Sequence, residues 1–181
     1  MKTVQVRNVT IGEGRPKICV PIVGQTKEEI LAEAVSFAEL PIDVVEWRAD
    51  WYEDVFDTDK VLETAKELNT VLKDTPILFT FRTAKEGGEK SISNEDYQNL
   101  NLTVAKSGLV DLIDVEAFTG DELVKEIITN AHKSNVKVVA SNHDFDKTPE
   151  KEELIRRLCK MQELDADIPK IAVMPTCRRD V

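Results

Sequence analysis

The sequence has few of the residues that mark fibrous, disordered or disulfide-rich proteins. Its 181 residues include only 7 Gly, 7 Pro and 3 Cys. With 41% hydrophobic residues, this composition excludes a collagen-like or low-complexity chain and predicts one packed domain over residues 1–181. The apolar runs are only a few residues long, and the N-terminus has no apolar core of signal-peptide length, so we expect no membrane partner and no secretion.

The cysteines and the basic residues are also too few for several kinds of site. Cys19, Cys159 and Cys177 have no CxxC spacing and an odd total, which argues against a disulfide framework or a structural zinc site and fits the cytoplasm. Acidic residues number 34 against 24 Lys and Arg, a net charge of −10. Because this charge repels phosphate backbones, we expect no nucleic-acid partner.

Six short apolar runs rich in Val and Ile predict the fold class. They suit strands that are buried on both faces, and their midpoints lie roughly thirty residues apart, the length of a βαβ unit. We therefore predict an α/β fold with parallel strands and helical crossovers. The runs are 18–23, 42–47, 77–81, 109–115, 136–140 and 171–174, and the segments 4–6 and 9–11 ahead of them predict a short hairpin.

Polar segments between these runs have helical spacing and recognisable N-terminal caps. Thr26 followed by Glu29 is typical of a capping box. The other predicted helix starts are Thr58 or Asp59, Ser93 with Asp96, Asp121, and Thr148 as the cap before Pro149.

Charged and polar side chains gather where the predicted strands end. In parallel α/β sheets ligands approach the carboxyl ends of the strands, and charges beside buried strands are unfavourable unless they meet each other or a ligand. The sequence therefore predicts a polar pocket formed by Glu46, Arg48, Arg82, Glu86, Asp114, Glu116, 141–144 and Lys170.

Two of these residues are candidates for covalent and acid-base chemistry. Lys170 has apolar neighbours on both sides and could act as a nucleophilic amine, although a lysine beside a proline is more often a solvated strand start. We expect Arg48 or Arg82 to help the amine lose its proton. His143, at a strand end, is a candidate general base or a structural histidine, whereas His132, near the end of a helix, suits a surface role.

The remaining candidates divide between structure and substrate binding. Glu46 and Arg48 alternate with Trp47 and share one strand face, so they form either a buried ion pair or a clamp for substrate hydroxyls or a carboxylate. Glu86 lies in a Gly-containing turn and is either a surface charge or the group that fixes the ring tautomer of His143. No P-loop, GxSxG, GxGxxG or paired-histidine metal motif is present.

Five segments together resemble one enzyme family, type I 3-dehydroquinate dehydratase. The resemblance covers essentially the whole chain in order, and five motifs with compatible spacing make it specific. The segments are 12–17 (GEGRPK), 46–48 (EWR), 79–89 (FTFR followed by EGGE), 141–149 (SNHDF followed by TP) and 169–175 (PKIAVMP).

The resemblance implies a (β/α)8 barrel that converts 3-dehydroquinate to 3-dehydroshikimate and water through a Schiff base. It implies that Lys170 forms the imine, that His143 moves the proton and that Glu86 orients His143. Glu46, Arg48 and Arg82 would bind the substrate. No metal or organic cofactor is then required, and the small-molecule substrate is the expected partner.

The chain departs from this family in its number of strands. Such barrels typically need about 250 residues, and here about six β/α units precede Val181, without the later arginine, serine and glutamine that the family uses. We therefore expect a C-terminally incomplete barrel or an open sheet whose edge strands pair with a second copy as a homodimer. A Schiff-base aldolase and an inactive, ligand-binding barrel fragment are the alternative functions.

Overall fold

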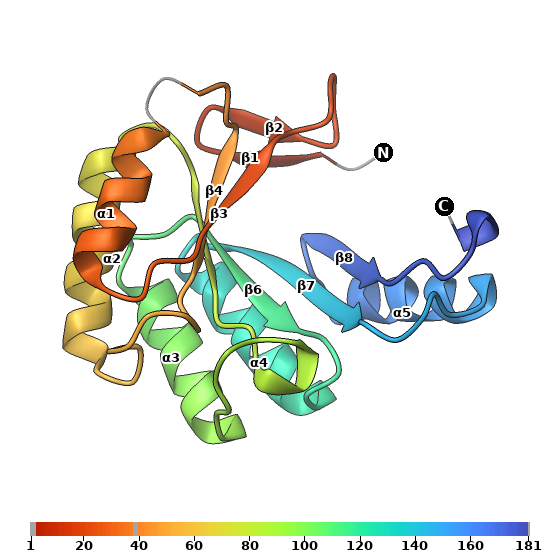
Figure 1. Ribbon diagram of the computed structural model, residues 1–181. Coiled ribbons are helices and arrows are strands. Elements are labelled where there is room, and N and C mark those ends of the chain that lie inside the picture. Colours follow the sequence, from red (N-terminus) through yellow and green to blue (C-terminus); the bar gives the residue numbers. More distant parts are fainter. Residues whose placement is uncertain (1–2, 38–39, 181) are drawn as a thin grey trace.

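Six parallel strands form the sheet on which the rest of the chain is arranged (Figure 1). The structure is a computed structural model that describes residues 3–37 and 40–180. The sheet order is β3-β4-β5-β6-β7-β8, so each strand lies beside the next strand of the sequence. The strands are β3 (Cys19–Ile22), β4 (Val44–Arg48), β5 (Ile77–Thr80), β6 (Leu112–Glu116), β7 (Lys137–Asp144) and β8 (Ile168–Val173). The predicted parallel α/β fold is confirmed.

Five helices connect these strands. Two of them begin at capping residues identified in the sequence, and two others begin at the predicted residues Thr58 and Asp121. Thr26 and Glu29 form the predicted capping box, and Ser93 accepts from the Asp96 amide. The helices are α1 (Lys27–Ser36), α2 (Thr58–Leu72), α3 (Asn94–Lys106), α4 (Asp121–Lys133) and α5 (Lys151–Glu163), with short 3₁₀ turns η1 (Ala84–Glu86) and η2 (Arg178–Asp180).

The predicted start of the fifth helix is wrong. Helix α5 starts at Lys151, and Thr148 does not cap it. The Thr148 hydroxyl instead donates to the Met174 carbonyl at 3.1 Å, so this residue joins the loop after β7 to the end of β8. A sequence pattern cannot distinguish these two uses of a threonine hydroxyl, because the second depends on a residue 26 positions away.

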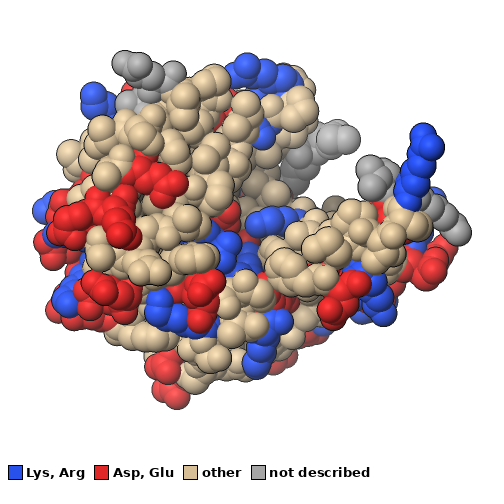
Figure 2. All heavy atoms as spheres, viewed as in Figure 1, with Lys and Arg blue, Asp and Glu red and all other residues tan. Residues whose placement is uncertain are grey.

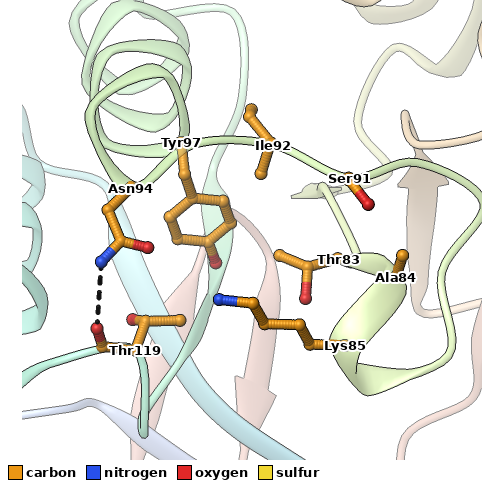
Figure 3. A pocket seen from close by; sticks show the side chains of 8 residues that line it. All are labelled: Thr83, Ala84, Lys85, Ser91, Ile92, Asn94, Tyr97 and Thr119. Carbon is orange, nitrogen blue, oxygen red and sulfur yellow. Dashed lines mark hydrogen bonds between the residues drawn. The ribbon is translucent and has the colours of Figure 1, made fainter.

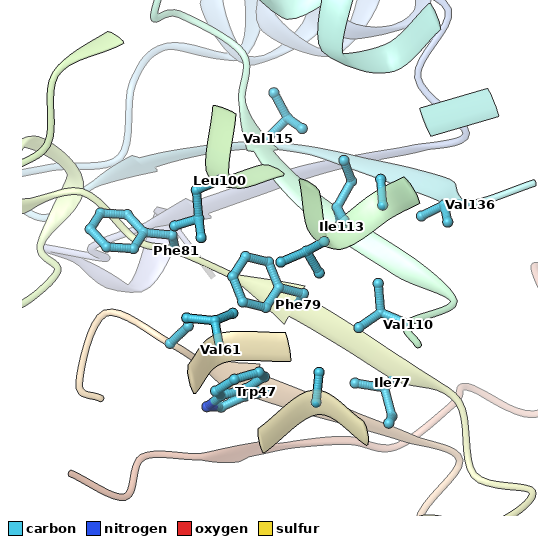
Figure 4. Packing of buried hydrophobic residues seen from close by; sticks show 14 of the residues in the cluster. Trp47, Val61, Ile77, Phe79, Phe81, Leu100, Val110, Ile113, Val115 and Val136 are labelled. Atoms are coloured by element: carbon cyan, nitrogen blue, oxygen red, sulfur yellow. The ribbon is translucent and has the colours of Figure 1, made fainter. Parts of the chain in front are cut away.

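The outer face of the sheet packs against helices in one apolar core (Figure 4). Trp47 and Phe79 lie edge to face, with ring centroids 5.4 Å apart. Helix α2 contributes Val61 and Leu68, both with no exposed surface. Because side chains alternate along each strand, these apolar residues lie on the outer face of the sheet, and the residues between them lie on the inner face.

The inner face has a second, smaller apolar cluster where the strands begin. It contains Val44, Leu78, Leu112 and Val139 from four neighbouring strands. The predicted hairpin, β1 (Val4–Val6) and β2 (Val9–Ile11), is confirmed and packs its valines against this cluster. The hairpin therefore packs beside the amino end of the inner face, and the polar groups lie further along the strands, toward their carboxyl ends.

Strands β3 and β8 are the edges of the sheet. In the described residues each pairs with one neighbour only, so the six strands form an open, curled sheet. Every residue of β8 is half-buried, and α5 has a single buried residue, Met161. Figure 1 shows β8 and α5 beside each other, away from helices α1 and α2. The open edges expected from six strands are confirmed.

Candidate active site

Strand register places the two predicted reactive side chains on the same face of the sheet. Lys170 of β8 pairs with Ser141 of β7, and His143 lies two residues beyond Ser141. Side chains of paired parallel residues share a face, as do residues two apart. A rise of about 3.3 Å per residue and a strand spacing of about 4.8 Å put the two Cα atoms about 8 Å apart, which suits a small substrate between them.

Lys170 reaches into a hollow over the inner face. Its amine lies 3.7 Å from Asp114 Oδ2 and 3.9 Å from Glu46 Oε1, and its side chain is 36% exposed. Glu46 and Lys170 line this hollow of about 570 Å³ together with apolar strand residues. Figure 2 shows Lys and Arg side chains at the bottom of a hollow between the body of the molecule and the β8–α5 edge.

The charged partners of the Lys170 amine are carboxylates. Arg48 pairs with Asp50, whereas Arg82 shares Asp114 with Lys170. Alternation along one strand could not reveal this arrangement, because the competing carboxylates come from other strands and loops.

Arg82 lies at the centre of the buried charges. Its guanidinium, 4% exposed, donates to Asp114 at 2.8 Å, to Glu116 at 3.0 Å and to the Ser141 hydroxyl at 3.0 Å, and lies 3.8 Å from Glu86. The Ser141 hydroxyl in turn donates to Asp114 at 2.6 Å. A planar cation with five N–H donors can satisfy several carboxylates at once, which a lysine could not do in this geometry.

The protonation of the two carboxylates on β6 follows from their neighbours. Burial acts to raise the pKa of Asp114, but the charges of Arg82 and Lys170 and the Ser141 hydroxyl outweigh it, so its pKa lies below the ordinary value. Burial raises the pKa of Glu116 above its ordinary value. Asp114 Oδ2 has no hydrogen-bond partner in the described chain, and it faces the Lys170 amine.

His143 is held on one side by Glu86. The ring Nδ1 and the backbone amide of His143 both lie against Glu86 Oε2, at 2.9 and 3.0 Å, and the Asn142 amide donates to Glu86 Oε1 at 3.1 Å. Because a carboxylate only accepts, Nδ1 carries the proton and the neutral ring presents Nε2 as an acceptor. The Phe145 ring stacks near the imidazole, with centroids 6.2 Å apart.

Glu46 and Arg48 share a strand face, but each has another partner, so the ion pair between them that was one of the two alternatives is not formed. Arg48 donates through Nε and Nη2 to the two oxygens of Asp50, both at 2.8 Å, and Glu46 accepts from Thr80 at 2.8 Å. Sequence reasoning missed Asp50, which is fully buried. Residues 46, 48 and 50 follow the same period of two, so extending the alternation by two residues beyond Arg48 would have indicated Asp50.

Two other features lie apart from this pocket. His132, in the last turn of α4, is half-buried and contacts Asp167 at 2.7 Å through Nε2. A cavity of about 30 Å³ between η1 and α3 is lined by residues that include Lys85, Tyr97 and Thr119 (Figure 3). This volume has room for about one or two water molecules and is too small for a substrate.

The described residues contain no cluster of three or more His, Cys, Asp or Glu side chains arranged to hold a metal ion. They also contain no helix that is long and apolar enough to cross a membrane. All three cysteines are free and exposed.

Polar side chains toward the carboxyl ends of parallel strands, with an amine and an imidazole on one face of the sheet, are typical of (β/α)-barrel enzymes. Comparison with known proteins narrows this class to one family. The family model for type I 3-dehydroquinase matches residues 18–181, and the chain belongs to this family.

Individual relatives agree with this assignment. A 3-dehydroquinate dehydratase of Clostridium botulinum is 61% identical over 180 residues, which cover 99% of this chain and 71% of the relative. The crystal structure of the type I enzyme from Clostridium difficile has a TM-score of 0.97 and 55% identity, over 99% of this chain and 71% of that one. The enzyme from Geobacillus kaustophilus has a TM-score of 0.96 at 36% identity, over 99% of this chain and 70% of that one. The predicted family is confirmed.

More distant structures share only the fold. A protein described as QR15, an aldolase, has a TM-score of 0.63 at 21% identity. A 3-hexulose-6-phosphate synthase has a TM-score of 0.59 at 16% identity. These similarities confirm a barrel-type architecture and give no support to the aldolase alternative.

Replacement of Gly88 tests how closely the loop after β5 packs against the backbone that carries Arg82. A Cβ at residue 88 would lie 2.5 Å from the Arg82 carbonyl carbon and closer still to its oxygen, so the backbone would have to move. We predict that Gly88→Ala lowers the free energy of unfolding by about 2 kcal/mol, measured by urea denaturation. Gly108→Ala is the control, because its Cβ meets open space and only its φ of +70° adds strain, about 1 kcal/mol. Equal losses in both variants would contradict the close packing.

Proposed function

We propose that this chain dehydrates 3-dehydroquinate to 3-dehydroshikimate in the shikimate pathway, through a Schiff base on Lys170. Family membership supports the reaction. The observation that carries the mechanism is the β7–β8 register, in which Lys170 and His143 share one face and His143 lies two residues beyond the partner of Lys170. A nucleophile and a base at this spacing can act on neighbouring carbons of one substrate.

Lys170 acts first in this mechanism. Its uncharged amine adds to the substrate ketone, and loss of water gives an imine, which is protonated on nitrogen. A protonated imine withdraws electrons from the adjacent carbon far better than a ketone does, so the proton on that carbon becomes removable by an imidazole. This chemistry requires neither a metal nor an organic cofactor.

His143 then moves the proton. Its free Nε2 takes the proton from the carbon beside the imine, and the resulting imidazolium donates a proton to the departing hydroxyl, which leaves as water. Glu86, 2.9 Å from Nδ1, keeps Nε2 free and stabilises the imidazolium. Hydrolysis of the imine releases the product and restores Lys170.

Glu46, Arg48 and Arg82 are the proposed substrate-binding residues. Arg48 uses Nε and Nη2 for Asp50, which leaves Nη1 for a substrate carboxylate or hydroxyl. Glu46 lies 3.9 Å from the Lys170 amine and offers an acceptor for a substrate hydroxyl. Arg82, whose donors meet three protein groups, would hold the substrate mainly through its charge.

We also propose a cytoplasmic homodimer. Three free, exposed cysteines suit a reducing compartment. The unpaired sides of β3 and β8 present free backbone N–H and C=O groups, which favour pairing with another strand. Exposed apolar side chains lie beside these edges, with Ile18 45% and Met174 45% exposed.

Reduction of the imine tests the assignment of Lys170. Borohydride added with 3-dehydroquinate should leave a mass adduct that peptide mapping places on Lys170, and Lys170→Ala should abolish both the adduct and turnover. Lys147→Ala is the control, because Lys147 lies outside the hollow. Turnover without an adduct would exclude the Schiff base, carbon–carbon cleavage would indicate an aldolase, and binding without turnover would indicate a ligand-binding protein.

Replacement of His143 tests the proton-transfer step. His143→Ala should slow turnover by about 10²- to 10⁴-fold and leave imine formation in place, so the trapped adduct should accumulate. His132→Ala is the matched control, since the other histidine of the chain contacts Asp167 away from the hollow. Undiminished turnover of His143→Ala in a stopped-flow or steady-state assay would exclude His143 as the base.

The edge strands generate a prediction for the homodimer. A lysine at an edge disfavours strand pairing, so Ile18→Lys should lower the association constant measured by sedimentation velocity. Val35→Lys adds the same charge at an exposed position of α1 and should leave association unchanged. A wild-type chain that stays monomeric across its soluble concentration range would contradict the homodimer.

A further inference from the structure

An arginine on α5 lies behind the strand that carries His143. Arg157 donates through Nη1 to Asn142 Oδ1 at 2.8 Å and through Nε to Glu153 at 2.8 Å. Its side chain is 18% exposed, and Nη1 also lies 3.7 Å from Asp144. The amide that Arg157 contacts belongs to the residue that precedes His143 in β7.

A continuous chain of hydrogen bonds joins Arg157 to the imidazole. Arg157 donates to Asn142 Oδ1, the Asn142 amide donates to Glu86 Oε1 at 3.1 Å, and Glu86 Oε2 accepts from the ring of His143 at 2.9 Å. Asn142 is buried, so its amide has little water to replace either partner. We propose that Arg157 is a positioning residue that fixes the ring of His143 through Asn142 and Glu86. This inference rests on the proposed role of His143.

The chemistry of an amide explains why a cation is needed at the end of this chain. A flipped Asn142 would turn its NH₂ group toward the Arg157 donors and its oxygen toward the Glu86 carboxylate. Both contacts would then be repulsive. Arg157 thus selects the orientation in which Asn142 is a donor to Glu86, and Glu86 is left with its second oxygen for Nδ1 of His143.

Without Arg157, the Asn142 oxygen has no charged donor and the amide can turn. Glu86 would lose a donor on Oε1 and part of the restraint on its position. His143 would then be free to carry its proton on Nε2 instead of Nδ1, and a ring in that tautomer cannot accept a proton from the substrate. The predicted defect is therefore in proton transfer, while substrate binding and imine formation continue.

Arg156 provides a matched control on the same helix. It also pairs with Glu153, through Nε and Nη2 at 2.6 and 2.8 Å. Its side chain is 59% exposed, and its hydrogen bonds in the described chain go only to Glu153. Loss of Arg156 removes the same charge and the same carboxylate partner as loss of Arg157, without the bond to Asn142.

The experiment compares Arg157→Met with Arg156→Met in the full chain. Methionine replaces the unbranched apolar stem of the arginine and removes its donors. Arg157→Met should lower kcat about tenfold, as loss of an outer partner of a functional histidine does, with KM and the borohydride adduct on Lys170 retained. Arg156→Met should keep the wild-type kcat, and Arg157→Lys, which keeps the cation, should restore most of it.

A second measurement reads the ring itself and needs no substrate. Long-range ¹⁵N–¹H spectra at high pH should show His143 as the Nδ1–H tautomer in the wild type and a second tautomer in Arg157→Met. His132, the other histidine of the chain, is an internal reference that should not change. In an Asn142→Ala background, Arg157→Met should have little further effect on kcat, because the chain of bonds is already broken.

The outcomes separate this inference from the proposed function. Equal kcat values for Arg157→Met and Arg156→Met, with one tautomer of His143 in both, would overturn the positioning role. If Arg157→Met does not fold, Asn142→Ala takes its place, because it breaks the same hydrogen-bond chain one step nearer to Glu86. A second tautomer of His143 in Asn142→Ala would support the positioning role, and a single tautomer would overturn it. A wild-type chain with neither adduct nor turnover would refute the proposed function, while the tautomer measurement would still test the hydrogen-bond chain.

Discussion

The buried positive charge of Arg82 is the interaction on which the inner face of the sheet depends. Asp114 and Glu116 lie two residues apart on β6 with almost no exposed surface, and each carboxylate receives one of the guanidinium N–H groups. Removal of one partner from a buried ion pair typically costs about 3–5 kcal/mol, because it leaves a charge without compensation. Without Arg82, the carboxylates at the end of β6 would have to take up protons or draw in water, and the strand ends would separate.

This cluster also sets the electrostatics around Lys170. Arg82 and Ser141 bind one oxygen of Asp114, so the other oxygen is left facing the Lys170 amine. A protonated imine keeps a positive charge where the ammonium stands, and the free oxygen of Asp114 would stabilise that charge throughout the reaction.

The sequence predicted which strand ends carry polar and charged side chains, and the structure shows why it could not predict the contacts between them. Period-two alternation correctly put Glu46 and Arg48 on one face. It could not choose between partners on the same strand and partners elsewhere, so Asp50 was missed as the partner of Arg48. Likewise, Arg157 has no signal in its own segment, because an arginine four residues after a glutamate on a helix is usually a surface ion pair.

The proposed nucleophile, Lys170, lies on an edge strand of the sheet. Six paired residues join β7 to β8, but the other side of β8 is unpaired in the described chain, and α5 contributes one buried residue, Met161. Segments with few buried apolar contacts open locally at a lower free energy than the core. Thr148 and Arg157 therefore have a role beyond their single bonds, since both tie the β8–α5 edge to β7 and its following loop. Lys170 can face His143 only while this edge is closed on β7, so the stability of the edge limits the fraction of molecules whose reactive groups are in register.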